Sequence, residues 1–178
     1  MEVAEKEFVG YRIPEGIVPW GLKACIAGGY AADPVLAGDM DVWIFAPTDA
    51  TTEELHGTRI RVLDFLQNQH GLEFEEQEGF RREGADAYST SLMVARVTLP
   101  GFQTTIHLRV TTCADEADLI SGFDISTHQI AVTDEGEVIR GSRWTPTNVP
   151  PRVLKMTSTT PVRLEKIGAR YAHLRKEQ

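Results

Sequence analysis

The chain has 178 residues, a length typical of one domain that buries its own core, so residues 1–178 are treated as a single domain. It has no run of about 18 apolar residues, and its acidic start lacks a signal-peptide pattern, so we expect a cytoplasmic protein without a membrane segment. The net charge of −8 argues against broad binding to duplex DNA, because phosphate contacts dominate that affinity.

Residues 1–19 contain prolines and glycines that interrupt any periodic pattern, which predicts an irregular lead-in at the edge of the sheet. The fold proper starts with a buried strand at 22–27. A short helix follows the Gly28-Gly29 pair to about residue 37, and a second strand covers 39–46.

A longer helix is expected between Thr51 or Thr52, as the cap, and Gly71, where it ends. Its apolar residues recur at helical spacing and are predicted to be core. These residues are Leu55, Ile60, Val62, Leu63, Phe65 and Leu66. Residues 72–88 are charged and contain two glycines, so they predict a loop and no sheet element.

Two strands, 91–98 and 102–110, are joined by Pro100-Gly101, which predicts an antiparallel hairpin. A short helix at 114–121, a strand at 127–133 and a short strand ending near Arg140 complete the sheet. Cys25 and Cys113 have no metal-ligand or redox spacing, so both are expected to be reduced and structural. His128 and Gln129 are expected at a strand edge, without a role.

The end of the chain consists of a proline-rich connector at 141–160 and a terminal helix at 161–175, with Thr159 or Thr160 as its cap. The predicted buried face is made of Val162, Leu164, Ile167, Tyr171 and Leu174. On the opposite stripe, three- and four-residue spacing aligns Arg163, Lys166 and Arg170 as a basic ridge. Residues 152–178 carry a net charge of +5, against −13 for the rest of the chain. The ridge either solvates an outer helix face or contacts a polyanionic ligand.

The stretch from residue 26 to residue 45 combines the glycine pair with an Asp-x-Asp strand. Because strand side chains alternate faces, Asp39 and Asp41 project from one side about 7 Å apart and can share a hard cation such as Mg2+ or Mn2+. The glycines let backbone approach a ligand closely, and a helix N-terminus presents free N–H groups to phosphate. The pattern predicts a site for a metal-bound triphosphate.

This pattern, Ala-Gly-Gly-x-x-x-Asp-x-x-x-x-Gly-Asp-x-Asp, resembles the head motif of the DNA polymerase beta-type nucleotidyltransferase superfamily, in the form seen in CCA-adding enzymes and poly(A) polymerases. Two further segments, 122–132 and 163–171, are similar to small nucleotidyltransferase-like proteins of phages and large DNA viruses. A phage protein would act in the host cytoplasm. We expect nucleotide contacts at Gly28, Gly29, Tyr30 and Asp33, and phosphate or acceptor contacts from the basic ridge of Arg163, Lys166 and Arg170.

The resemblance also implies a third carboxylate on a neighbouring strand, yet the strand that aligns carries His107 and Arg109 at its outward positions. Three explanations remain open. His107 acts as base or metal ligand; Asp124 supplies the carboxylate from an adjacent segment; or the site binds nucleotide without transferring it. The family pattern also has an arginine where this chain has Ala32.

The sequence therefore predicts an α+β protein with a minimal nucleotidyltransferase fold: a mixed, mostly antiparallel twisted sheet, flanked by helices, with a C-terminal helix. The expected reaction is metal-dependent transfer of a nucleoside monophosphate from NTP to a hydroxyl of RNA, protein or a small molecule. The alternative is a catalytically inactive module of the same fold that binds a partner in a viral or toxin–antitoxin setting.

Overall fold

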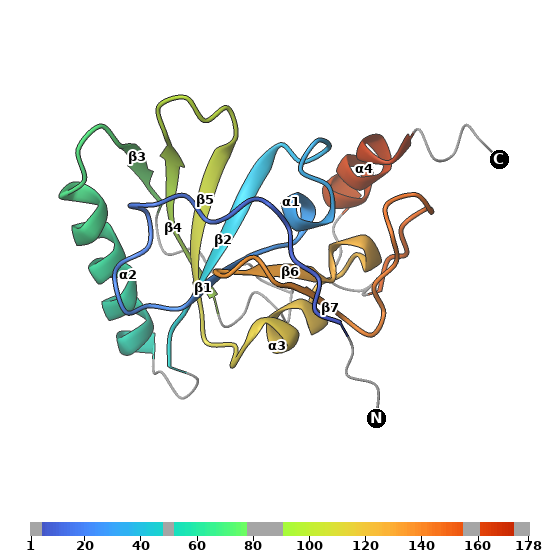
Figure 1. The fold of residues 1–178 in the computed structure, drawn as a ribbon, viewed down its shortest axis with the longest axis horizontal. Helices are drawn as coiled ribbons and strands as arrows, with labels where there is room; N and C mark the ends of the chain where they lie inside the picture. The colour runs from blue at the N-terminus through green and yellow to red at the C-terminus, as the bar shows by residue number, and fades with distance from the viewer. Residues whose placement is uncertain (1–4, 48–51, 78–90, 155–160, 173–178) are drawn as a thin grey trace.

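The computed structural model describes residues 5–47, 52–77, 91–154 and 161–172. One sheet of seven strands forms the centre, in the order β3-β4-β5-β2-β1-β6-β7 (Figure 1). The strands are β1 Ala24–Ala27, β2 Asp39–Phe45, β3 Glu73–Glu76, β4 Ser91–Thr98, β5 Thr105–Thr111, β6 Ile130–Thr133 and β7 Val138–Arg140. All neighbouring strands are antiparallel except β2 and β5, which run parallel. This confirms the predicted α+β class and the mixed, mostly antiparallel sheet.

Within the described residues, five helical segments accompany the sheet: α1 Gly29–Ala32, α2 Thr52–Gln67, α3 Glu116–Ser121, a 3-10 helix Ser126–His128 and α4 Pro161–Arg170. In Figure 1, α2 lies beside the β3 end of the sheet, and α4 lies near α1 at the opposite end. Strands β5, β2, β1 and β6 lie between these two ends of the sheet.

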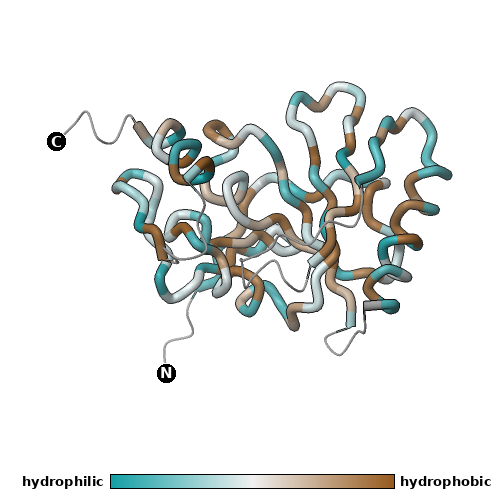
Figure 2. The backbone as a smooth tube through the Cα atoms, turned by 180° about the vertical axis from the view of Figure 1, so that it is seen from behind, coloured by the Kyte–Doolittle hydropathy of each residue, from teal (hydrophilic) through white to brown (hydrophobic). Residues whose placement is uncertain are grey.

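The side chains of β2 alternate between two hydrophobic cores, one on each face of the sheet. Met40, Val42 and Ile44 are buried in the larger core with apolar residues of α2. Trp43 and Phe45 point to the other face and pack in a smaller core with residues of α3. Figure 2 shows apolar segments through the central strands and polar segments in the outer loops. Asp39 and Asp41 share the Trp43 face, so they lie on the α3 side of the sheet.

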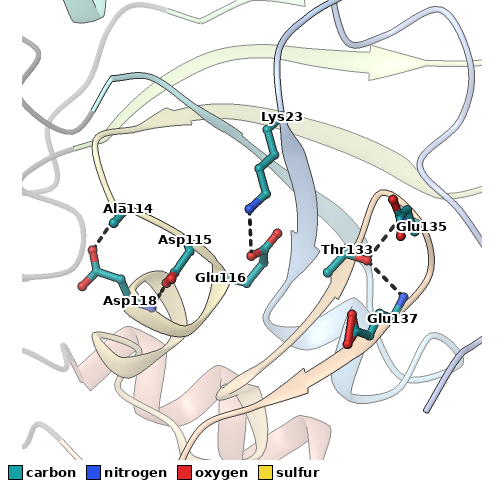
Figure 3. A network of polar contacts seen from close by, with 8 residues as sticks. All are labelled: Lys23, Ala114, Asp115, Glu116, Asp118, Thr133, Glu135 and Glu137. Atoms are coloured by element: carbon teal, nitrogen blue, oxygen red, sulfur yellow. Dashed lines mark hydrogen bonds and ion pairs between the residues drawn. The ribbon is translucent and has the colours of Figure 1, made fainter. Parts of the chain in front are cut away.

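Local hydrogen bonds determine where α3 begins (Figure 3). The Asp115 carboxylate accepts a hydrogen bond from the Asp118 backbone N–H at 2.8 Å, which is a standard N-cap. Glu116 is buried and pairs with Lys23 Nζ at 3.3 Å. The helix ends at Ser121 and covers only the Trp43 and Phe45 end of its face. The Asp39 and Asp41 end is left to form a cleft.

The lead-in follows the edge of the sheet, as predicted. The Val138 N–H donates to Glu7 O at 2.8 Å, and the Val9 N–H donates to Gly136 O at 3.0 Å. Ile17 is fully buried in the main core. The lead-in therefore extends the hydrogen bonding of β7 and closes part of the core.

Two sequence predictions about the first half of the chain are wrong. Residues 73–76 form β3, paired with β4, although the segment was expected to be a loop. Its glutamates suit an edge strand, where charge discourages further pairing, and Phe74 packs against the core. Ile60 of α2 is 54% exposed, while Leu55, Val62, Leu63 and Leu66 are buried. Thr51 and residues 78–88 lie outside the described residues.

The predicted hairpin is confirmed, because β4 and β5 are antiparallel neighbours. The strand predicted at 127–133 begins only at Ile130, since Ser126–His128 form a 3-10 turn. Both cysteines are free, and burial raises the pKa of the Cys25 thiol well above its ordinary value. None of the helices in the described ranges combines the length and apolar character that crossing a bilayer requires.

The buried face of α4 differs from the prediction. Ile167 and Tyr171 are buried with Ile125, but Val162 is 77% exposed. Positions 163, 166, 167, 170 and 171 share one helix face by their three- and four-residue spacing, so the basic residues and the buried pair lie on the same side. The basic ridge is therefore not on the outer stripe. Thr159, Thr160 and Leu174 lie outside the described residues.

Candidate active site

A cleft of about 190 Å3 opens where α3 leaves the sheet uncovered. Its floor is formed by β1, β2 and β5, and α4 forms one wall. The lining residues are Ala27, Gly28, Gly29, Asp39, Asp41, Trp43, His107, Arg109, Phe123, His128, Arg163, Lys166, Ile167 and Arg170. Most of the predicted site residues therefore lie around one cleft.

Asp39, Asp41 and His107 lie together on the floor because β2 and β5 run parallel in a fixed register. Asp41 is paired with His107 across the two strands. His107 Nε2 lies 3.7 Å from Asp39 Oδ1, and His107 Nδ1 lies 3.7 Å from Asp41 Oδ1. The imidazole therefore bridges the two carboxylates, in the place where the family resemblance implies a third acid.

Burial lowers the pKa of His107 below its ordinary value, and the two aspartates oppose that shift without reversing it. Arg109 and Arg96 lower it further. Desolvation therefore favours the neutral form of the imidazole, whereas the two carboxylates favour its charged form.

Arg109 follows two residues after His107 on the same face of β5 and is the strand neighbour of Trp43. Its Nε donates to Asp41 Oδ1 at 3.2 Å, and its guanidinium carbon lies 5.4 Å from the centre of the Trp43 ring. Asp41 Oδ1 thus faces both His107 and Arg109. The sequence identified Arg109 as outward-facing but gave it no role in the site.

Asp124 is held by Arg163 from α4. Arg163 Nε donates to Asp124 Oδ2 at 2.7 Å, and Arg163 Nη2 donates to Asp124 Oδ1 at 2.8 Å, a bidentate pair. Asp124 is 6% exposed and is not among the residues that line the cleft. The structure therefore places this carboxylate behind Arg163, where it anchors α4.

Gly28 and Gly29 each need to be glycine, for different structural reasons. Gly28 has φ +93°, a conformation that L side chains rarely adopt, and its N–H donates to Ile130 O at 3.2 Å. A Cβ on Gly29 would lie 2.6 Å from Arg170 Nη1. Gly28 thus permits the turn out of β1, while Gly29 makes room for the guanidinium of Arg170.

Behind Arg170 lies a buried polar pair. His128 Nε2 is 3.2 Å from Tyr171 Oη and 3.5 Å from Arg170 Nη1. Burial lowers the pKa of His128 to about 3, and the positive charges of Arg163 and Arg170 add to the effect. The ring is therefore neutral, so Nε2 can accept a hydrogen bond from either neighbour. The expected strand-edge location of His128 is wrong: it is 5% exposed and lines the cleft.

Tyr30 and Asp33, both predicted to contact nucleotide, are not among the residues that line the cleft. The Asp33 carboxylate accepts hydrogen bonds from the backbone N–H groups of Val35 and Leu36, at 3.0 and 3.3 Å. Tyr30 packs edge-on against Tyr11, with ring centres 5.4 Å apart. In this arrangement both residues support the α1 turn.

The cleft is positively charged in an acidic protein. Among the residues that the structure describes, four Arg and Lys residues line it against two Asp residues, while the whole chain carries −8. Arg163 is largely neutralised by Asp124, which leaves Arg109, Lys166 and Arg170 as the cations that can face a ligand. This combination suits an anionic ligand that also carries a metal ion.

Phe123 and His128 line the cleft although their sequence positions did not indicate it, and Arg109, expected to face outward, had no expected role there. Trp43 and Arg109 follow Asp41 and His107 at two-residue spacing, so strand alternation places both on the cleft side of the sheet. Phe123 lies in an irregular segment and His128 in the short 3-10 helix, and neither gives a periodic signal that indicates the direction of a side chain.

No known protein-family model and no curated protein matches this sequence. Among solved structures, the fold is similar to that of a tRNA-processing enzyme in an apo form, with a TM-score of 0.50 and 20% sequence identity. The similarity covers 83% of this chain and 36% of the other, so this chain spans about a third of that enzyme's length. At this identity the similarity establishes a shared fold.

Proposed function

We propose that this protein is a nucleotidyltransferase, which moves a nucleoside monophosphate from an NTP to a hydroxyl group. The observation that carries the proposal is the placement of Asp39, Asp41 and His107. Each ring nitrogen of His107 lies 3.7 Å from an oxygen of one aspartate, beneath a wall of cationic side chains. A metal-bound triphosphate needs carboxylates that bind the metal ion and cationic side chains that bind the phosphate oxygens, and both are present here.

The donor set fits Mg2+ or Mn2+. Asp39 and Asp41 are partly exposed and offer hard oxygen ligands. In the described ranges, no group of three His, Cys, Asp or Glu residues is arranged to hold an ion by itself, so the two aspartates would share the coordination with water and substrate. Mg2+ commonly takes one or two carboxylates and completes its coordination with water and substrate phosphates. When bound, the ion would neutralise charge that develops on the transferring phosphoryl group.

The surrounding residues have distinct roles in this proposal. Arg170 and Lys166 bind phosphate oxygens from the α4 side. The acceptor oxygen forms a bond to the α-phosphorus, the bond from that phosphorus to the leaving oxygen breaks, and pyrophosphate departs. The hydroxyl proton passes to a ring nitrogen of His107, which lies beside both carboxylates.

RNA is the first acceptor to test, because the structurally similar protein is a tRNA-processing enzyme. The purified chain is incubated with each labelled NTP, Mg2+ and a set of RNA, protein and small-molecule acceptors. We expect label to move to an acceptor. Asp39→Asn and Asp41→Asn should each abolish transfer, while Asp64→Asn, at an exposed position of α2, should not. No binding of Mg-ATP at millimolar nucleotide would contradict the proposal.

A second candidate is nucleotide binding without transfer. Two observations favour it. On the strand where a third carboxylate is expected, Arg109 is present instead and pairs with Asp41 at 3.2 Å. The other candidate carboxylate, Asp124, is paired with Arg163. Its expected result is calorimetric binding of Mg-ATP that Asp39→Asn weakens, with no labelled product from any acceptor.

A further inference from the structure

We propose that the cleft holds one divalent cation and that the Arg109 guanidinium takes the place of a second. The inference rests on the proposed function and specifies how that site balances the charge of the triphosphate. It starts from the oxygens of Asp39 and Asp41, because these carboxylates are the ligands the floor of the cleft provides.

Oδ1 of each aspartate already has a polar neighbour. Asp41 Oδ1 accepts from Arg109 Nε at 3.2 Å and also faces His107, while Asp39 Oδ1 faces the other ring nitrogen of His107. No hydrogen bond among the described residues involves Oδ2 of either aspartate. The protein therefore offers one oxygen from each carboxylate to an ion, which suits a single cation.

Two-metal sites place their ions about 3.5–4 Å apart, so both ions share the same ligands. Here a second ion would have to displace Arg109 from Asp41, or lie beside the positive charge of the Arg109 guanidinium. The guanidinium is always protonated, so it cannot be neutralised to make room. A second cation is therefore disfavoured by charge as well as by the number of ligands.

Contacts with Asp41 and Trp43 hold the Arg109 side chain in place. Its side chain is 19% exposed and lies over the Trp43 ring, with 5.4 Å between the guanidinium carbon and the ring centre. Arg109 also lines the cleft. A guanidinium has five N–H donors, and among the hydrogen bonds of the described residues only Nε–H is engaged. The remaining donors can bind phosphate oxygens, as an arginine does in other phosphoryl-transfer sites.

The test counts Mn2+ ions. The full chain is titrated with Mn2+ in the presence of saturating α,β-methylene-ATP, which is not cleaved at the bond that transfer breaks, and free Mn2+ is measured by electron paramagnetic resonance. We expect one Mn2+ per chain for the wild type. The double variant His107→Asp/Arg109→Gln supplies a third carboxylate and removes the guanidinium, and it should bind two.

A second readout isolates Arg109. Arg109→Gln should weaken binding of the nucleotide analogue at least tenfold, while Arg143→Gln, at an exposed loop arginine, should leave it unchanged. Two Mn2+ ions on the wild type together with nucleotidyl transfer would overturn the inference and leave the proposed function standing. Neither Mn2+ nor nucleotide bound to the wild type would overturn both. An unchanged affinity in Arg109→Gln would overturn the phosphate-binding role of Arg109.

Discussion

Arg170 occupies the space that a side chain on Gly29 would need: a Cβ built there would lie 2.6 Å from Arg170 Nη1. Gly29→Ala should therefore fold, because the clashing atom is the far end of a flexible side chain, but with Arg170 displaced from the cleft. Loss of one charge-assisted phosphate contact should weaken Mg-ATP binding about tenfold, equivalent to about 1.4 kcal/mol. Calorimetry measures the affinity.

The matched control is Gly38→Ala, where an added Cβ would meet no atom within 4 Å. This variant should bind Mg-ATP as the wild type does. Thermal unfolding should show little change for either variant. If Gly29→Ala binds nucleotide with unchanged affinity, then Arg170 does not contact the phosphates from its position beside Gly29.

Asp124 is, with His107, one of two residues proposed from the sequence to replace the missing third carboxylate, and its bidentate pair with Arg163 predicts a structural effect instead. Asp124→Ala leaves the Arg163 guanidinium, 20% exposed, without its carboxylate. Removing one member of a largely buried pair costs about 3 kcal/mol of unfolding free energy. Urea denaturation measures this loss, and Asp64→Ala on the exposed face of α2 should change stability by less than about 0.5 kcal/mol.

The opposite result would revive the catalytic role. If Asp124→Ala unfolds like the wild type but loses Mn2+ affinity, then the carboxylate leaves Arg163 in the working enzyme and serves as a ligand.

The docking of α4 onto the fold predicts a contrast between two of its apolar residues. Ile167 is 5% exposed and packs with Ile125 and Tyr171, whereas Val162 is 77% exposed. Ile167→Ala should cost about 2–4 kcal/mol of docking energy and weaken nucleotide binding, because Lys166 and Arg170 lie on the same helix. Val162→Ala should change both quantities little. Hydrogen exchange of α4 amides and calorimetry provide the measurements, and equal effects of the two substitutions would contradict this packing.

The strands could be predicted because each carries a clear two-residue alternation. Asp39 and Asp41 were placed correctly on one face, and His107 was placed on the outward face of its strand. Alternation along a strand does not, however, reveal which strands are neighbours. The parallel pairing that brings Asp41 beside His107 depends on chain segments far apart in sequence, and it became visible only in the assembled sheet.

The terminal helix could not be oriented from its sequence for a different reason. Its sequence is strongly amphipathic, with the basic residues on one side, and that pattern by itself predicts that the basic side faces solvent. Residues outside the helix determine which face is buried: Asp124 pairs with Arg163, and Ile125 packs against Ile167. Both partners lie in an irregular segment, where sequence patterns carry little directional information.

The buried, neutral His128 makes stability depend on pH. Its pKa is about 3 in the folded protein, against an ordinary value of 6.5, so between these values the unfolded chain binds a proton that the folded chain does not. The contribution of His128 is fully present above pH 6.5 and is lost progressively as the pH falls toward 3. Between pH 6.5 and pH 5 the loss is about 2 kcal/mol of unfolding free energy.

Urea denaturation at several pH values between 7 and 5 measures this loss, and His128→Gln separates it from other titrations. Glutamine cannot be protonated in this range, yet its side chain can still accept a hydrogen bond from the Tyr171 hydroxyl. The variant should therefore lose less stability than the wild type over the same pH interval. His70→Gln, at an exposed position, should retain the wild-type slope. If wild type and His128→Gln lose stability in parallel, then His128 is not buried as a neutral ring beside Arg170.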